Sequence, residues 1–461
     1  MVDRFLLILL ALACPTTAFA VKSITVESSF SYYKDRSEES IVEELKANEY
    51  RDVRLLSGTP KLVKAFKDAS VRVWYLTFMN GTYSTNGFPE GWEKWQMKLR
   101  KPGNPDGFTY LCCNNPEYRE WKRKQIVDML NSDGYDGVDL VEPYFPAYPG
   151  PSSGQYGCLC DHCIAAFKKM YPDETDVPDL SDPKSPHYWK TDKTLYEKWV
   201  GFRAASVVSF LDDIVNGKDG IREKCPKVKV ATWSLGLDVA DQITKLREAE
   251  GLDAAAIVKR VKPDMHVIQT HWPDWTKPSL SSKYPIKYKP VIDSIREVSP
   301  RLPLMLQTDI GSLMDMRRSR SWLEEVEKSA KAAGFEEVTS YEYSIGRYMY
   351  TEPPKIVKIE EEPDGLKLVF HKRLNAATAS NIGNYTVSSG KVDYVRVDGN
   401  IVRLSISGAD RDIEVTMSGI SDDESRRLYH DKPACVIEDN SHVSLSDTPD
   451  SEEDEETADD F

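Results

Sequence analysis

Three cysteines stand close together in the middle of the chain, in the run Cys158-Leu159-Cys160-Asp161-His162-Cys163. Cysteines this close in sequence do not pair easily with each other, because a disulfide requires suitable separation and direction of the Cβ atoms. Three thiolates in one short loop do suit tetrahedral zinc, with a fourth thiolate arriving from elsewhere. We predict a structural zinc site formed by Cys113, Cys158, Cys160 and Cys163, with Cys112 as the alternative to Cys113.

The cysteine count also bears on this choice. The chain has eight cysteines, and seven remain if Cys14 belongs to a cleaved leader. An odd number cannot be satisfied by disulfides alone. A four-cysteine zinc site would leave Cys225 and Cys435 for one possible bridge. A disulfide framework around the same loop stays open as the alternative.

Four carboxylates lie in or just after short apolar runs: Asp139, Glu142, Asp309 and Glu342. Glycoside hydrolysis uses two carboxyl groups across the scissile bond, one protonated and one ionised. We predict Glu142 as the acid/base, with its partner among the other three. Structural roles are also open, because an inward Asp139 can pair with a basic residue, Asp309 can cap a turn, and Glu342 can bind a sugar hydroxyl or pair with Arg347.

Aromatic and polar side chains gather at the same positions. Flat aromatic faces pack against the C–H faces of sugar rings, while nearby polar groups bind hydroxyls. The alternative is that tryptophans in long loops only pack those loops together. The predicted substrate-binding residues are Glu27, Tyr144, Trp233, His271, Trp272 and Tyr341.

These residues fall at the ends of eight apolar runs that alternate with helical segments. Parallel strands alternating with helices over about 330 residues favour a closed (β/α)8 barrel over an open α/β sheet. In such barrels the chemistry lies at the carboxyl ends of the strands. The expected strands are Ile24–Ser28, Val53–Leu56, Val71–Phe78, Gly137–Glu142, Val228–Ser234, His266–Thr270, Leu304–Thr308 and Val338–Tyr343.

The rest of the chain differs in character. Residues 1–20 have a short apolar run that ends in Ala18-Phe19-Ala20, which is typical of a secretory signal peptide. We expect the barrel over residues 21–352, a small antiparallel β-sandwich over 353–437, and a disordered acidic tail over 438–461. That tail has eleven acidic and no basic residues, so most of the net charge of −14 belongs to it. No basic patch is present, which argues against nucleic acid as a partner.

Two families resemble parts of the chain. The cysteine cluster followed by Ala165-Ala166-Phe167, with a distant upstream cysteine, resembles the zinc-carrying bacterial β-galactosidases and related barrel hydrolases. The resemblance implies that Glu142 is the acid/base at the end of strand four, and that Asp309 stands where that family has its nucleophile, which is a glutamate there. Val141 departs from that family, which has Asn at this position, so the sugar specificity does not carry over. The run Asn384-Tyr385-Thr386-Val387 resembles bacterial immunoglobulin-like modules.

Together these observations predict a secreted or extracellular glycoside hydrolase acting on a polysaccharide or glycan. A cell-surface lipoprotein attached through Cys14 is a less favoured location. The alternative function is a non-catalytic carbohydrate-binding or scaffold protein with a degenerate barrel. A zinc-dependent hydrolase is disfavoured, because the seven histidines are not grouped with aspartates at metal-ligand spacing. No organic cofactor and no membrane span are expected.

Overall fold

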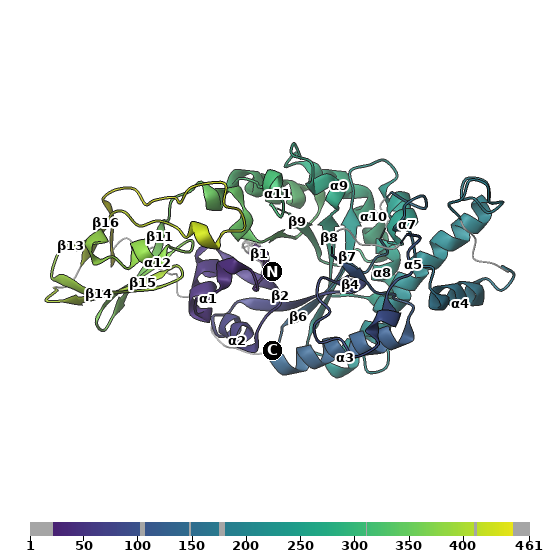
Figure 1. The fold of residues 1–461 in the computed structure, drawn as a ribbon, viewed down its shortest axis with the longest axis horizontal. Helices are drawn as coiled ribbons and strands as arrows, with labels where there is room; N and C mark the ends of the chain where they lie inside the picture. The colour runs from purple at the N-terminus through teal and green to yellow at the C-terminus, as the bar shows by residue number, and fades with distance from the viewer. Residues whose placement is uncertain are drawn as a thin grey trace, which may run out of the picture.

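The computed structural model describes residues 22–101, 107–146, 149–174, 180–309, 311–409 and 413–445. Eight parallel strands close into a barrel in the order β1-β10-β9-β8-β7-β6-β3-β2, with helices around it (Figure 1). The barrel is closed because β1 pairs with both β2 and β10. The strands are β1 (Lys22–Glu27), β2 (Tyr50–Leu56), β3 (Arg72–Phe78), β6 (Gly137–Val141), β7 (Lys229–Gly236), β8 (Met265–Thr270), β9 (Leu304–Thr308) and β10 (Glu337–Tyr341). The predicted barrel is therefore confirmed, and the open sheet is excluded.

The helices follow from capping residues and from one apolar face each. Ser37, Thr59 and Asn115 accept backbone N–H bonds at the starts of α1, α2 and α3. Gly134 and Gly334 end α3 and α11 in the left-handed conformation that glycine favours. The main helices are α1 (Glu38–Ala47), α2 (Pro60–Asp68), α3 (Pro116–Asp133), α4 (Asp161–Met170), α5 (Lys193–Asn216), α7 (Gln242–Glu250), α8 (Ala254–Val261), α10 (Lys289–Val298) and α11 (Arg320–Ala333). None of the helices in the described residues is long and apolar enough to cross a bilayer. The predicted signal peptide lies outside the described residues.

Two insertions enlarge the carboxyl end of the barrel. After β3, the chain forms a hairpin of β4 (Gly81–Thr82) and β5 (Thr109–Tyr110) before it enters α3. After β6, a long segment containing α4 extends away from the barrel, at the opposite end of the molecule from the C-terminal strands (Figure 1). Both insertions follow strand ends, so they lie beside the expected site.

The C-terminal module has a core of its own and two antiparallel sheets. One sheet has the order β11-β12-β15-β14, and the other has the order β13-β16-β17. The strands are β11 (Ile356–Glu362), β12 (Gly365–Phe370), β13 (Tyr385–Val387), β14 (Lys391–Asp398), β15 (Ile401–Ser407), β16 (Glu414–Met417) and β17 (Ser441–Ser444). The predicted all-β module is thus present, while its immunoglobulin-like character stays a prediction. Because β17 pairs with β16, the boundary predicted at residue 437 is too early. The remainder of the predicted tail, residues 446–461, lies outside the described residues.

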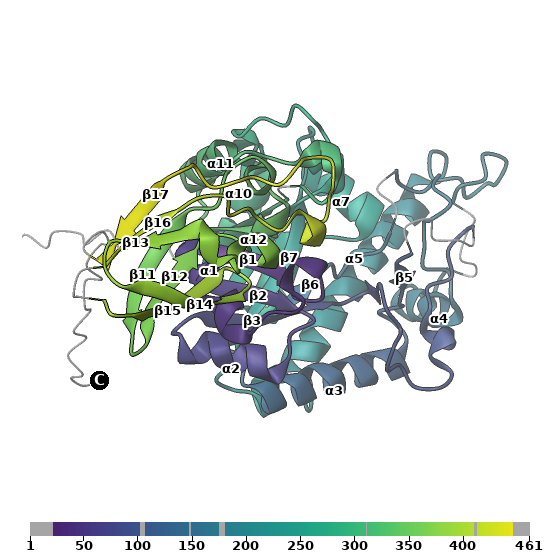
Figure 2. The same cartoon turned by 60° about the vertical axis from the view of Figure 1, so that its left-hand side comes forward.

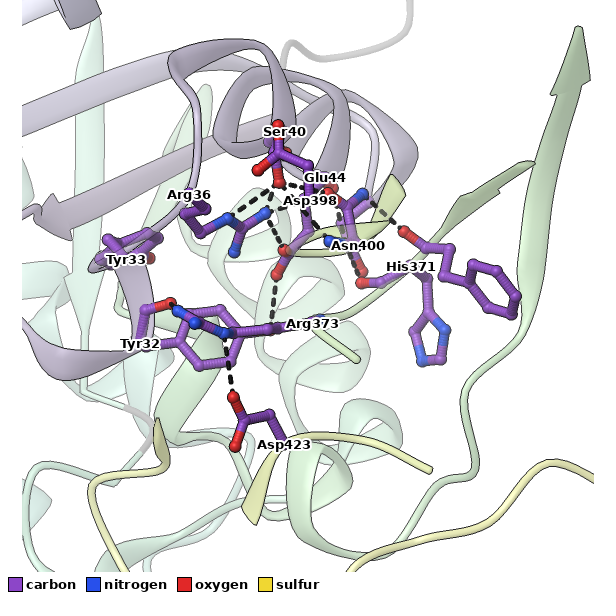
Figure 3. Close-up of polar contacts among 12 residues, drawn as sticks. Tyr32, Tyr33, Arg36, Ser40, Glu44, His371, Arg373, Asp398, Asn400 and Asp423 are labelled. Carbon is purple, nitrogen blue, oxygen red and sulfur yellow. Dashed lines mark hydrogen bonds and ion pairs between the residues drawn. The ribbon is translucent and has the colours of Figure 1, made fainter. Parts of the chain in front are cut away.

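A buried polar joint connects this module to the barrel. Figure 2 shows the module in front of β1 and α1, and Figure 3 shows the side chains between them. Arg373 donates to the backbone oxygens of Tyr32 (2.8 Å) and Lys34 (2.6 Å), and its Nε lies 3.2 Å from Asp423. Arg36 forms a buried ion pair with Glu44 of α1 at 2.5 Å. The module is therefore held by specific hydrogen bonds as well as by apolar contact.

Arg36 also reaches across the joint. Its Nη2 donates to Asn400 of the turn between β14 and β15 at 3.0 Å, and Asn400 in turn donates to the Phe370 oxygen at 2.8 Å (Figure 3). The Tyr32 hydroxyl donates to Glu44 at 2.6 Å and accepts from the Arg373 N–H at 3.0 Å. The buried ion pair between Arg36 and Glu44 in the barrel is thus joined by hydrogen bonds to residues of the C-terminal module.

Candidate active site

The floor of the candidate site is set by the alternation of side chains along the barrel strands. Trp74, Trp233, Val267 and Met305 pack together inside the barrel. Since side chains alternate between the two faces of a strand, the residues two positions further along β8 and β9 point the same way. These residues are Gln269 and Gln307. Gln269 was not predicted as a site residue, although its position in the expected strand 266–270 would have revealed it.

Glu142 directly follows β6 and turns toward this floor. Its backbone has a φ of 52°, a left-handed conformation that a residue other than glycine seldom adopts. Its Oε1 accepts a hydrogen bond of 3.3 Å from Nε2 of Gln269. Burial raises the pKa of Glu142, while hydrogen bonds from Gln269 and Tyr144 oppose that shift. The side chain is half-buried at the carboxyl end of β6.

His271 and Trp272 lie on the same side of the mouth, but only one of them is exposed. His271 is buried, and its Nε2 lies 2.8 Å from Oε1 of the buried Glu250 at the end of α7. The electrostatic effect of His271 lowers the pKa of Glu142, and that of Glu250 raises it. Trp272 begins the short helix α9 (Trp272–Trp275), and 49% of its surface is exposed. Of the two predicted binding residues, Trp272 is the exposed one.

Asp309 follows β9 and is half-buried. Its Oδ1 accepts hydrogen bonds from the backbone N–H groups of Gly311 (2.8 Å) and Ser312 (2.9 Å). It therefore caps a turn, which was the structural role left open for it. Burial raises the pKa of Asp309, while those backbone hydrogen bonds and the charge of Arg318 lower it.

Tyr341, the last residue of β10, lies among carboxylates. It is half-buried, and burial raises the pKa of its phenol, with further contributions from the charges of Glu342, Asp309 and Glu27. Glu27, the last residue of β1, accepts a 3.0 Å hydrogen bond from the Ser29 N–H. Tyr341 thus ends the strand that lies between β1 and β9.

Glu342 has a different environment from the other predicted catalytic residues. It is fully buried, and its oxygens accept hydrogen bonds from the Glu27 N–H, from the Tyr33 hydroxyl (2.7 Å) and from the Ser344 hydroxyl (3.0 Å). Burial raises its pKa to about 8. Glu342 therefore holds the end of β1 in place and does not itself face the mouth.

Asp139 and Trp233 lie deeper, inside the barrel. Asp139 is fully buried and pairs with Arg54 at 2.5 Å, and Trp233 donates to Asp139 through Nε1 at 2.7 Å. Asp139 thus accepts hydrogen bonds from both Arg54 and Trp233. The structure thus favours the ion-pair role for Asp139, and it places Trp233 below the sugar-accessible surface because its indole is buried in the barrel core.

The cysteine cluster lies beside the mouth and is formed by Cys112, Cys158, Cys160 and Cys163, whose sulfurs all lie within 4.8 Å of one another. The choice of Cys113 was therefore wrong, because Cys112 directs its Sγ to Cys160 (3.5 Å) and Cys163 (3.4 Å) and takes the fourth place in the cluster.

Four sulfurs around zinc at about 2.3 Å would stand about 3.8 Å apart, so the cluster fits this metal. The side chain of Asn114 donates to the Cys163 sulfur at 3.3 Å, a contact typical of the surroundings of bound metals. Cys225 and Cys435 are free thiols with different neighbours, so the suggested bridge between them is not formed.

No family model matches the sequence, and no curated protein is significantly similar to it. Solved structures do match. The glycoside hydrolase domain of PgaB (BpsB) from Bordetella bronchiseptica aligns with 70% of this chain and 94% of its own, with a TM-score of 0.50 and 13% identity. Gan42B, a GH42 beta-galactosidase from G. stearothermophilus, aligns over 70% of this chain and 51% of its own, with a TM-score of 0.50 and 16% identity. At these identities, the likeness establishes a barrel fold of the kind found in glycoside hydrolases.

Proposed function

We propose that this protein is a glycoside hydrolase acting on a polysaccharide or glycan. The observation that carries the proposal is Glu142, a half-buried carboxyl group with a raised pKa at the barrel mouth, oriented by Gln269. Asp309 supplies a second carboxylate on a strand separated from β6 by β7 and β8. Trp272 offers an exposed aromatic face beside them.

In this proposal, the two carboxyl groups divide the work. Glu142, which burial keeps protonated to higher pH than an exposed glutamate, gives its proton to the glycosidic oxygen as the bond breaks. Asp309 accepts two backbone N–H hydrogen bonds, which favour its charged form, and stabilises the positive charge that develops at the anomeric carbon. Gln307 on β9 and Tyr341 on the neighbouring β10 lie on the Asp309 side of the mouth and are suited to binding sugar hydroxyls.

A carbohydrate-binding protein without catalysis is the second candidate. Asp309 uses one carboxylate oxygen to cap its own turn, which is a structural task. A protein that only binds glycan would need the exposed aromatic surface of Trp272 and no second reactive carboxylate.

The decisive experiment is hydrolysis of a panel of polysaccharides, followed as release of reducing ends, by the wild type, Glu142→Gln and Glu120→Gln. Glu120 is exposed on α3 and serves as the matched control. We expect Glu142→Gln to lose activity by about 100-fold or more, because general acid catalysis contributes on that scale, while Glu120→Gln behaves as the wild type. Undiminished cleavage by Glu142→Gln would assign the acid elsewhere. Retention of a glycan without cleavage by all three proteins would favour the binding protein.

We also propose that Cys112, Cys158, Cys160 and Cys163 hold one structural zinc ion, and that the chain is secreted. Zinc bound by four thiolates would brace the segment after β6 against the turn before α3 and would leave no position open for water. The test is metal content by mass spectrometry, with Cys112→Ser compared with Cys113→Ser. We expect about one zinc per chain in the wild type and in Cys113→Ser, and much less in Cys112→Ser. Equal zinc loss in both variants would contradict the assignment.

A further inference from the structure

A second cavity lies beside the barrel mouth, outside the ring of strands. It has a volume of about 390 Å³ and lies between the ends of β2 and β3, the segment that starts with β4, and α3. Leu56 and Phe78 line it, and both also pack against the cluster inside the barrel. Leu56 and Phe78 therefore stand between the cavity and the interior of the barrel.

The notable residue in this cavity is Lys122 of α3. Only 7% of its surface is exposed, and its Nζ donates to Oγ1 of Thr77 at 2.7 Å and to Oε1 of Gln125 at 3.4 Å. Neither partner carries a charge, and burial alone lowers the pKa of Lys122 to about 7. By contrast, the buried Lys372 pairs with Asp422 at 2.6 Å. Burying an ammonium group without a counter-charge is costly, so such a residue calls for a specific reason.

An ammonium group has three donors, and the two contacts of Lys122 use two of them. A carboxylate in the cavity would accept the third N–H and supply the missing negative charge. A single lysine suits one negative charge, because phosphate sites usually combine several donors or a helix N-terminus. The polar part of the cavity is completed by Gln125, whose Nε2 donates to the Tyr75 hydroxyl at 2.7 Å.

Several of the other side chains that line the cavity are aromatic and suit the binding of a sugar ring. Phe88 and Trp121 both line the cavity, with ring centroids 4.5 Å apart and planes inclined by 53°. Tyr118 and Tyr135 add further aromatic surface. Aromatic faces of this kind pack against the C–H faces of sugar rings. The lining thus combines one cation, neutral hydrogen-bonding groups and aromatic surface.

We propose that this cavity binds the carboxylate-bearing ring of a hexuronic acid, with Lys122 as its cation and Trp121 as part of its ring-binding wall. The proposal deepens the proposed function and rests on it for the polymeric substrate. Because Leu56 and Phe78 end β2 and β3, which run parallel to β6, an acidic unit bound here would lie at the same end of the barrel as Glu142. The substrate would then be an acidic glycan.

The test is calorimetric titration of the full chain with D-glucuronate at pH 6, where Lys122 is charged, and with D-glucose as the neutral comparison. Lys122→Gln is compared with Lys124→Gln, because Lys124 lies on the same helix with an exposed side chain. We expect saturable binding of glucuronate in preference to glucose. The dissociation constant should rise about tenfold or more in Lys122→Gln and stay unchanged in Lys124→Gln.

Two further measurements separate the possible outcomes. Glu142→Gln should bind glucuronate like the wild type, so loss of hydrolysis and loss of this site are distinguishable. If Lys122→Gln does not fold, as judged by thermal unfolding, the preference of the wild type for glucuronate over glucose decides the question alone. Absence of that preference, or full binding by a folded Lys122→Gln, would overturn the proposal.

Discussion

Glu142 and Glu342 both follow a barrel strand with a positive φ, 52° and 56°, yet their surroundings differ. Glu142 is half-buried and shares a hydrogen bond with Gln269 at the mouth. Glu342 is fully buried and binds the N–H of Glu27. Backbone strain of this kind is often found near functional sites. Here one strained glutamate faces the site and the other supports the strand end next to it.

The raised pKa of Glu342 predicts how the free energy of unfolding changes with pH. Because its pKa is raised to about 8 in the folded protein from an ordinary value of 4.5, the folded state holds a proton that the unfolded state releases. Stability due to this group is therefore fully present below pH 4.5 and is lost as the pH rises toward 8, by at most about 1.4 kcal/mol per pH unit. Glu342→Gln should not show this loss.

The measurement is urea unfolding of the wild type and Glu342→Gln at pH 5 and pH 8. The free energy of unfolding of the wild type, relative to that of the variant, should fall between the two pH values. Other titrating groups are common to both proteins, so they cancel in this difference. A constant difference would show that Glu342 keeps the same charge in the folded and unfolded states over this range.

At the scale of elements, the loop after β9 is held by a segment from the other module. The hydroxyl of Tyr429 donates to the oxygens of Ser312 and Gly311, the two residues whose N–H groups bind Asp309. Arg317 of the same loop makes two hydrogen bonds to Asp431, at 2.9 and 2.6 Å. Its guanidinium also lies 5.3 Å from the ring of Tyr429. The C-terminal module thus contributes to the position of a proposed catalytic residue.

Tyr429→Phe removes the hydroxyl and leaves the ring in place. We expect kcat to fall by roughly two- to tenfold, which corresponds to one hydrogen bond of about 0.5–1.5 kcal/mol, with little change in KM or in Tm. Tyr394→Phe is the matched control, because Tyr394 is exposed on β14 of the same module. Unchanged kinetics in Tyr429→Phe would show that the loop holds Asp309 without this contact.

The elements themselves were predictable from the sequence, but several roles within them were not. Each barrel strand lies within three residues of its expected range, because buried apolar runs and helix-ending glycines are local signals. The ion pair of Asp139 with Arg54 and the burial of Trp233 depend on packing inside the closed barrel. Cys112 and Cys113 are neighbours in sequence, and only the path of the backbone decides which sulfur joins the cluster.

At the scale of the whole molecule, the joint between the modules depends on contacts that no local pattern reveals. Arg373 and Tyr32 are 341 residues apart, and a hydrogen bond between them cannot be read from either segment alone. Lys122 was not predicted as a site residue for a similar reason. Its burial beside the neutral Thr77 depends on the packing of α3 against β3. Contacts between residues far apart in the sequence could thus not be predicted from local patterns.

Arg373→Met tests whether the joint stabilises the molecule. Its removal leaves the oxygens of Tyr32 and Lys34 and the carboxylate of Asp423 without their donor. We expect the free energy of unfolding to fall by about 3 kcal/mol, as for the loss of one partner from a buried pair. Chemical unfolding is the measurement, and Arg396→Met, at an exposed position on β14, is the control. If the two variants have the same free energy of unfolding, the contacts of Arg373 make no net contribution to stability.

The pairing of β1 with β10 also has a consequence for how the chain reaches its native state. Glu27 and Glu342, which meet at this seam, are 315 residues apart in sequence. While the chain is being synthesised, β1 has β2 beside it but has no second neighbour until nearly the whole barrel has been made. Its open edge during that interval is a surface on which other chains can assemble. Refolding should therefore be slow and concentration-sensitive, with closure of this seam as the late step.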